Sequence, residues 1–132
     1  MIERRASCPC GALTAAARGE PARVSVCHCG ACKRRTGSAF SYNATYPEAQ
    51  VEAIGPSKRF RRTGEEAYWG EFHFCAECGA TIVYRIERRP SMVTIPVGAF
   101  ADADFPEPTV SVYRELGHKW ITFETGGPLD EY

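Results

Sequence analysis

The residues with the clearest chemical potential are seven cysteines, grouped in three short clusters along the chain. In chain order the clusters are Cys8 and Cys10, then Cys27, Cys29 and Cys32, and finally Cys75 and Cys78. An odd number of thiols cannot all pair as disulfides, and three thiols within six positions cannot all pair with one another. Cysteine thiolates at such spacing are typical zinc ligands. The pattern therefore predicts metal ligation.

Glycine distinguishes the two cysteine pairs from the trio. Gly11 and Gly79 each follow the second cysteine of a pair, whereas Ala31 and Lys33 flank Cys32. A glycine at that place can adopt a positive φ, so that the chain curls and its N–H groups approach the sulfurs. Two such turns supply four thiolates, which close a tetrahedral structural zinc site. We therefore predict two Zn²⁺ ions per chain, with this partition of ligands: Cys8, Cys10, Cys75 and Cys78 for one, and Cys27, Cys29 and Cys32 for the other.

The three-cysteine cluster leaves a coordination position whose occupant the sequence does not identify. Three protein ligands plus an open position are typical of catalytic zinc, which accepts water or substrate there. The alternatives are a fourth protein ligand, or three buried free thiols. His28 alternates with the ligands in an extended backbone and should point away from their metal, while His73 and His118 remain possible from elsewhere in the fold.

Three cations follow the trio directly, in the sequence CKRRTGS. Lys33, Arg34 and Arg35 would offset the net negative charge of a zinc ion bound by three thiolates, and could attract an anionic substrate. Gly37 and Ser38 add a flexible, polar backbone beside the site and are further candidate substrate contacts. The competing interpretation is an ordinary solvated basic turn.

The elements that must position these residues are short strands. Apolar and β-branched runs bounded by glycine or proline predict strands at residues 12–18, 23–26, 39–46, 67–74, 81–84, 92–95 and 109–113. A helical turn is expected at residues 30–35 and a loop at residues 98–108, and the basic stretch 58–62 is expected to be a half-exposed strand rather than a nucleic-acid contact. The expected fold is therefore mainly β.

Length and charge narrow the class of protein. The chain has 132 residues, with 16 Lys and Arg against 16 Asp and Glu, so no basic field favours nucleic acid. One domain over residues 1–132 is expected at this length. The apolar run at residues 92–101 is far shorter than the roughly 20 residues that cross a bilayer, so no membrane role is expected. Free cysteines and the lack of a signal-like segment at the start predict a reducing cytoplasm.

The cysteine motifs also resemble a known family. The order CxCG, then CHCxxCKRxTGSAF, then FCxxCG is similar to the glutathione-dependent formaldehyde-activating enzymes, which include centromere protein V-like proteins. The resemblance implies a zinc-bearing β-tent fold, related to the Rab-associated zinc chaperones, over nearly the whole chain. It also implies a structural zinc on the four-cysteine set and a catalytic-type zinc on the trio. The segment at residues 117–132 is one of many variants within the family, and it affects the expected substrate more than the expected fold.

The function implied by this resemblance is a carbon–sulfur lyase-type reaction. Its substrates would be glutathione, or a related small thiol, and formaldehyde, combined as S-hydroxymethylglutathione. Two other functions remain open, because fold alone does not define activity. One is a non-catalytic zinc-binding module for protein interaction or chaperoning, and the other is detoxification of a different small electrophile. The sequence indicates neither a general base nor an oligomeric state.

Overall fold

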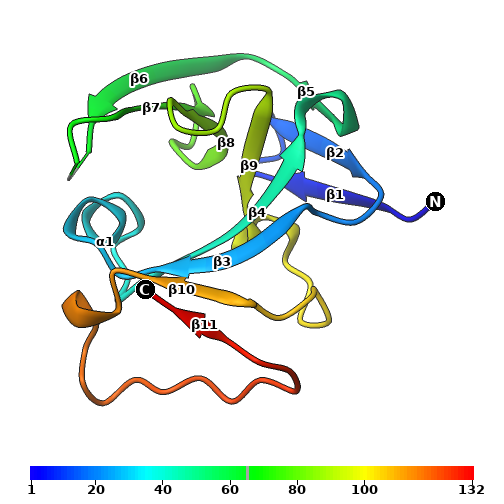
Figure 1. Ribbon diagram of the computed structural model, residues 1–132. Coiled ribbons are helices and arrows are strands. Elements are labelled where there is room, and N and C mark those ends of the chain that lie inside the picture. The colour runs from blue at the N-terminus through cyan, green and yellow to red at the C-terminus, as the bar shows by residue number, and fades with distance from the viewer. Residues whose placement is uncertain (65) are drawn as a thin grey trace.

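The computed structural model describes residues 1–64 and 66–132. Within these residues the strands form an eight-stranded sheet, in the order β11-β10-β3-β4-β9-β8-β7-β6, and a three-stranded sheet, in the order β1-β2-β5 (Figure 1). The elements are β1 (Glu3–Ser7), β2 (Thr14–Arg18), β3 (Arg23–Cys27), α1 (Gly30–Thr36), β4 (Ser41–Pro47), η1 (Glu48–Gln50), β5 (Val51–Ile54), β6 (Ser57–Thr63), β7 (Trp69–Cys75), β8 (Thr81–Ile86), β9 (Met92–Pro96), η2 (Val97–Phe100), β10 (Val110–Val112), η3 (Arg114–Leu116) and β11 (Asp130–Glu131). The predicted mainly β class is confirmed.

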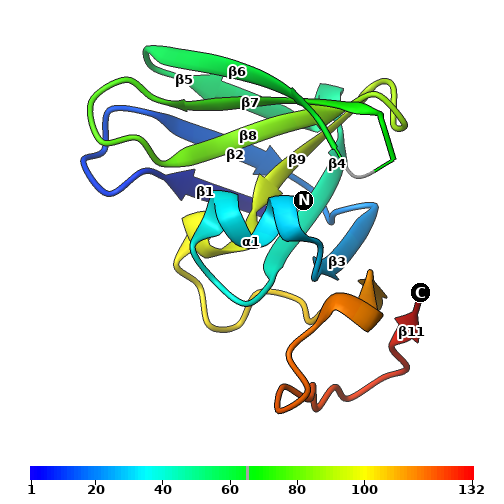
Figure 2. The ribbon, with the colours of Figure 1, turned by 90° about the vertical axis from the view of Figure 1, so that its left-hand side faces the viewer.

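The larger sheet bends along its length. Figure 1 shows β6, β7 and β8 arched above β3, β10 and β11, with α1 between these two parts at one end. The bend lies where β8 meets β9, a pair registered at Tyr84 opposite Thr94. Figure 2 views the same arrangement from the α1 side, with the helix below the β6–β8 arch. The bend leaves space between the arch and α1.

The core lies between the two sheets. Ala6, Ala15 and Ala17 of the small sheet are fully buried, which lets its backbone approach the large sheet closely. Ile82 and Ile95, both fully buried, come from the large sheet. Burial alternates along β2 with the period of two that a strand requires. The predicted strand at residues 12–18 is therefore confirmed, with its start moved to Thr14.

The predicted helical turn is α1, one residue longer than expected. It begins after Cys29, whose sulfur accepts the N–H of Cys32 at 3.3 Å as an N-cap. It ends at Gly37, which has a φ of 65° and donates its N–H to the Lys33 carbonyl at 2.8 Å. A left-handed residue after a helix is most often glycine, because a Cβ would strain it. A cysteine that the sequence predicts as a metal ligand thus also defines where the helix starts.

The other strand predictions are confirmed with shifted ends, and one loop prediction needs correction. Residues 67–68 belong to the turn before β7, since Ala67 has a φ of 66°, and residues 39–40 precede β4. The expected loop at 98–108 starts inside the 3-10 helix η2, because Val97 and Phe100 anchor that turn in the core. The strands β1, β5 and β11 were not predicted, since two are charged and all are very short.

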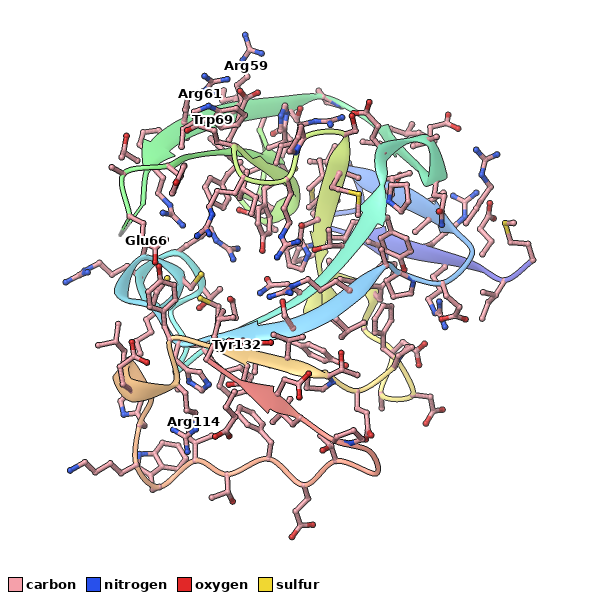
Figure 3. The ribbon with its side chains drawn as sticks, viewed as in Figure 1. Arg59, Arg61, Glu66, Trp69, Arg114 and Tyr132 are labelled. Atoms are coloured by element: carbon pink, nitrogen blue, oxygen red, sulfur yellow. The ribbon has the colours of Figure 1, made fainter. Side chains whose placement is uncertain are left out.

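The basic strand β6 alternates its side chains between two faces. Figure 3 shows Arg59, Arg61 and Trp69 projecting outward from β6 and β7, and Arg61 stacks 4.1 Å from the Trp69 ring. Phe60 and Arg62 point to the opposite face, toward α1. The expected strand is thus confirmed, but it is more exposed than expected, since every residue of β6 except Arg62 is exposed. In the part of the chain that the structure describes, no helix has the length and apolar character to cross a membrane.

Candidate functional site

The structure gathers the sulfurs of the two cysteine pairs. Those of Cys8, Cys10, Cys75 and Cys78 all lie within 4.8 Å of one another. The Cys10 sulfur is 3.6 Å from both Cys8 and Cys75. A tetrahedral zinc with Zn–S bonds of about 2.3 Å requires sulfurs roughly 3.8 Å apart. The four-cysteine cluster therefore fits zinc.

Local backbone geometry supports thiolates in this cluster. Gly11 and Gly79 each have a φ of 83°, as the sequence predicts. The Leu13 N–H donates to the Cys8 sulfur at 3.3 Å and lowers the pKa of Cys8 to about 6, and the Glu77 N–H donates to the Cys75 sulfur at 3.4 Å. Because Cys8 and Cys10 follow β1 while Cys75 and Cys78 lie between β7 and β8, a metal here would tie the two sheets together.

The second cluster lies at the end of β3 and the start of α1. The sulfurs of Cys27, Cys29 and Cys32 lie within 4.8 Å of one another. Hydrogen bonding from Cys27 and then Cys29 lowers the pKa of Cys32 to about 2, while the same interactions raise the pKa of Cys27. Ionisation of Cys32 is thus favoured over that of Cys27 and Cys29, and a bound cation would displace protons from the trio. The donor set fits zinc as well.

No histidine or carboxylate among residues 1–64 and 66–132 joins these three sulfurs within that range. His28 Nε2 instead pairs with the Ser111 hydroxyl at 3.2 Å, so its ring points away as expected. His73 Nε2 contacts Glu71 at 3.2 Å, and the His118 ring lies beside Trp120, with centroids 5.9 Å apart. The described part of the chain therefore leaves one side of the trio open.

A cavity of about 580 Å³ opens beside this cluster, and Cys27 and Cys32 form part of its wall. It is rich in arginine, with five guanidinium groups along it: Arg23, Arg35, Arg62, Arg88 and Arg89. Among the described side chains, the carboxylate at its rim is Glu66, which pairs with Arg88 at 2.7 Å. This arginine-rich cavity therefore favours an anionic ligand next to the three sulfurs.

Two of these arginines, Arg23 and Arg89, lie near enough for their charges to interact. Burial lowers the pKa of Arg23, and the positive charge of Arg89 lowers it further. Neither has an ion-pair partner among the described residues. Two like charges held close without a carboxylate repel one another, and a bound anion would relieve that repulsion. Sequence reasoning did not identify this pair, because Arg23 lies on β3 and Arg89 in the connection between β8 and β9.

Tyr113 contributes a hydroxyl to the same cavity. It follows β10 with a φ of 54°, a conformation that non-glycine residues adopt at a cost. Burial, together with contact with Glu66, raises the pKa of Tyr113 to about 12. The phenol therefore stays protonated at neutral pH and is a hydrogen-bond donor. Its neighbours in the sequence carry no motif that would have identified it.

A chain of hydrogen bonds leads from the Tyr84 hydroxyl to the Cys32 sulfur. The buried Tyr84 hydroxyl donates to Asn43 Oδ1 at 2.7 Å, and Asn43 Nδ2 donates to the Ser41 hydroxyl oxygen at 3.0 Å. The Ser41 hydroxyl hydrogen is then directed to the Cys32 sulfur, where it helps to lower the pKa of that thiol. Asn43 thus orients two hydroxyl groups at once.

Removing this amide should destabilise the protein. Asn43→Ala is expected to lower the free energy of unfolding by about 2 kcal/mol, because it leaves the Tyr84 hydroxyl buried without an acceptor. Tyr84→Phe removes the donor instead and should cost about 1 kcal/mol. Urea denaturation of both variants, and of the double variant, measures the difference. If Asn43→Ala lowers the free energy of unfolding no more than Tyr84→Phe does, the Asn43 amide is not required as the acceptor for the buried Tyr84 hydroxyl.

Of the five predicted substrate contacts, Arg34 and Arg35 line cavities, whereas the other three do not. Arg35 lines the arginine-rich cavity, and its guanidinium group is 5.0 Å from the centre of the Tyr84 ring. Arg34 lines a second cavity, on the other side of Arg35. Lys33 donates to the Leu116 carbonyl and so fastens α1 to η3. Gly37 and Ser38 complete the end of α1, where the Ser38 N–H donates to the Thr36 hydroxyl at 3.2 Å. Of the five, Arg35 therefore shares a cavity with Cys27 and Cys32.

Comparison with known proteins is consistent with this arrangement. The model of a family described as glutathione-dependent formaldehyde-activating enzyme matches residues 3–115, which include all three cysteine clusters. The chain belongs to this family. No curated protein matches it. The family description associates its members with formaldehyde activation, while the cysteine clusters are compatible with zinc.

A solved structure shares the fold. The crystal structure of a Rhodobacter sphaeroides protein superposes with a TM-score of 0.56 at 19% sequence identity, covering 86% of this chain and 95% of that one. At this identity the likeness concerns the fold alone.

Proposed function

We propose that this protein forms and breaks the carbon–sulfur bond between a glutathione-like thiol and formaldehyde at its three-cysteine cluster. The observation that carries the proposal is the open side of Cys27, Cys29 and Cys32 on the wall of a cavity with five arginines. Family membership supports glutathione and formaldehyde as the reacting pair. The product would be S-hydroxymethylglutathione.

The three cysteines would hold the reactive metal. A zinc ion bound by three thiolates offers an open coordination position and lowers the pKa of a thiol that enters it. The positive charge of Arg35 helps to keep Cys32 ionised, as does the Ser41 hydroxyl. The other four cysteines would bind a structural zinc, since four thiolates leave no position for substrate.

Arg23 and Arg89 would bind a carboxylate of the thiol. Arg23, Ser25 and Cys27 lie on one face of β3, because side chains alternate along a strand, and all three line the cavity. The four residue steps from Arg23 to Cys27 span about 13 Å along the strand. The Arg23 side chain can cover part of that distance toward the sulfurs. A tripeptide thiol has its sulfur and carboxylates separated on this scale. Binding one end therefore positions the other.

The bond-forming step needs a proton on the aldehyde oxygen. As the thiolate sulfur attacks the carbonyl carbon, the C=O π electrons move to the oxygen, which becomes the hydroxyl of the adduct. Tyr113 donates the proton from its phenol and regains one from the thiol that has ionised, so that protons balance over the cycle. The reverse sequence releases thiol and formaldehyde.

The direct test is exchange spectroscopy by NMR on glutathione and formaldehyde at equilibrium, with and without the protein. The exchange rate should rise with enzyme concentration above the uncatalysed rate. Equal rates with and without protein would refute catalysis of this reaction and leave the two other functions, a non-catalytic binding module or detoxification of a different electrophile.

Arg23→Ala separates binding from chemistry. The variant should raise the KM for glutathione by about 10- to 100-fold, the effect of losing a charge-assisted hydrogen bond, with kcat nearly unchanged. Arg59→Ala is the matched control, since Arg59 is 74% exposed on the outer face of β6. An unchanged KM in Arg23→Ala, or the same increase in Arg59→Ala, would contradict the assigned carboxylate contact.

A further inference from the structure

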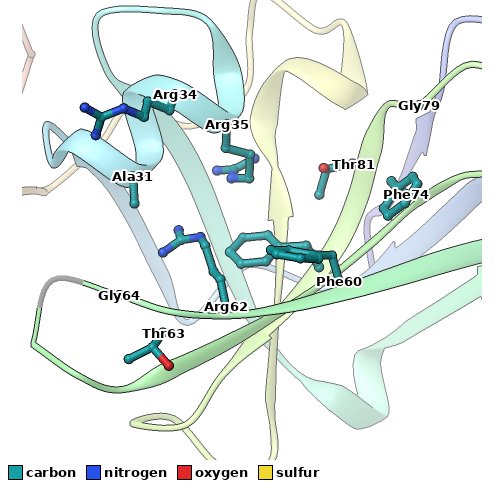
Figure 4. Close-up of a pocket in the computed structure, with 11 residues that line it drawn as sticks. Ala31, Arg34, Arg35, Phe60, Arg62, Thr63, Gly64, Phe74, Gly79 and Thr81 are labelled. Carbon is teal, nitrogen blue, oxygen red and sulfur yellow. The ribbon is translucent and has the colours of Figure 1, made fainter.

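A second cavity lies on the other side of Arg35, between α1 and the β6–β7 hairpin. Its volume is about 770 Å³, within the range of small-molecule sites. Figure 4 shows Ala31, Arg34 and Arg35 entering from the helix, opposite Phe60 and Arg62 of β6. We call it the phenylalanine cavity, after Phe60, Phe72 and Phe74 in its wall. The three-cysteine cluster does not line it.

The wall of this cavity is apolar on the sheet side. Phe72 and Phe74 stand on β7, and Phe60 stands opposite Phe72 on β6. Phe60 is 60% exposed, whereas Phe72 is buried. An exposed aromatic ring at the wall of a cavity favours an aromatic ligand that would pack on it and remove it from water.

Cations come from both sides of the cavity, two from α1 and one from β6. Arg34, Arg35 and Arg62 reach this cavity, and no Asp or Glu among the described residues lines it. None of the three has an ion pair with a described carboxylate. The guanidinium groups of Arg35 and Arg62 lie 5.2 Å and 4.7 Å from the centre of the Phe72 ring. Two N–H groups of Arg35 are buried without any acceptor.

These features together specify a ligand with an aromatic body and one anionic end. A carboxylate can accept two parallel N–H bonds from a guanidinium group, and a flat ring can pack against the phenylalanines. We propose that the phenylalanine cavity is a second binding site, which takes an aromatic carboxylic acid. The site stands apart from the proposed thiol chemistry, because its occupancy requires neither glutathione nor formaldehyde.

Binding of 2-naphthoate to the full, zinc-loaded chain tests this proposal by isothermal titration calorimetry. Saturable binding at one site per chain is expected, and 2-naphthamide, which lacks the charge, should bind at least about tenfold more weakly. Phe60→Ala and Arg34→Gln should each weaken naphthoate binding by about tenfold. Both residues are exposed and line this cavity but not the arginine-rich one, so neither change should disturb the fold or formaldehyde exchange.

Matched changes elsewhere control for general effects. Ile54→Ala removes an apolar side chain that is 50% exposed on β5, and Arg59→Gln removes an arginine from the outer face of β6. Neither should alter naphthoate affinity. No saturable binding by the wild type, equal affinity for the amide, or unchanged affinity in Phe60→Ala and Arg34→Gln would each overturn the second site. Because exchange activity is assayed separately, its loss would not count against this proposal.

Discussion

Cys29→Ser should remove one of two bound metal ions per chain and lower the rate of formaldehyde–glutathione exchange by at least about 100-fold. Loss of a partner that only orients a metal ligand already costs 10- to 100-fold, so loss of a ligand should reach or exceed the upper value. The fold should persist, since the trio lies at the end of β3 and the start of α1 and does not join the two sheets.

Serine is the informative replacement at this position because Cys29 also caps α1. Its sulfur accepts the Cys32 N–H, and a serine hydroxyl can accept the same bond. Cys29→Ala should lose exchange activity equally, and about 1 kcal/mol of stability in addition. Metal analysis, circular dichroism and exchange NMR on the two variants separate the roles. Wild-type exchange in Cys29→Ser, or two tightly held metal ions, would contradict an open zinc site on the trio.

Cys75→Ser should affect folding instead. Cys75 is 1% exposed, its sulfur lies 3.6 Å from that of Cys10, and the two come from turns in different sheets. Structural zinc contributes to folding outright, with apparent binding free energies of about 10 kcal/mol or more in small zinc domains. If one lost ligand costs about 4 kcal/mol, the midpoint of thermal unfolding should fall by about 15 °C at this chain length.

Thermal unfolding monitored by circular dichroism, together with metal stoichiometry, measures this effect. Cys29→Ser serves as the control, because it also deletes one thiol and one metal ion but from the other cluster. The expected contrast is a large drop in midpoint for Cys75→Ser and a small one for Cys29→Ser. Similar midpoints for both variants would show that the four-cysteine cluster does not hold the sheets together.

Most of what the sequence revealed about the two candidate metal sites came from the spacing of cysteines and glycines that are close together in the chain. Cys27, Cys29 and Cys32 fall at a strand end and in the first turn of a helix, so their proximity follows from a few backbone angles. Gly11 and Gly79 indicated tight turns for the same reason. Alternating and β-branched runs likewise located most strands, because a side-chain period of two depends on neighbouring residues only. Short charged strands such as β1 lack that signal.

Only the tertiary structure decided which side chains face those sulfurs. Arg23, Arg62, Arg89 and Tyr113 reach one cavity from four separate parts of the chain, because the larger sheet bends over α1. Lys33 stands beside the cluster in sequence, yet donates to the Leu116 carbonyl, while Arg35 two positions later turns inward. The helical rotation of about 100° per residue separates these neighbours. The proximity of cysteines within each sequence cluster was therefore encoded locally, whereas the meeting of Cys10 with Cys75 and the two cavities depend on how distant strands pack.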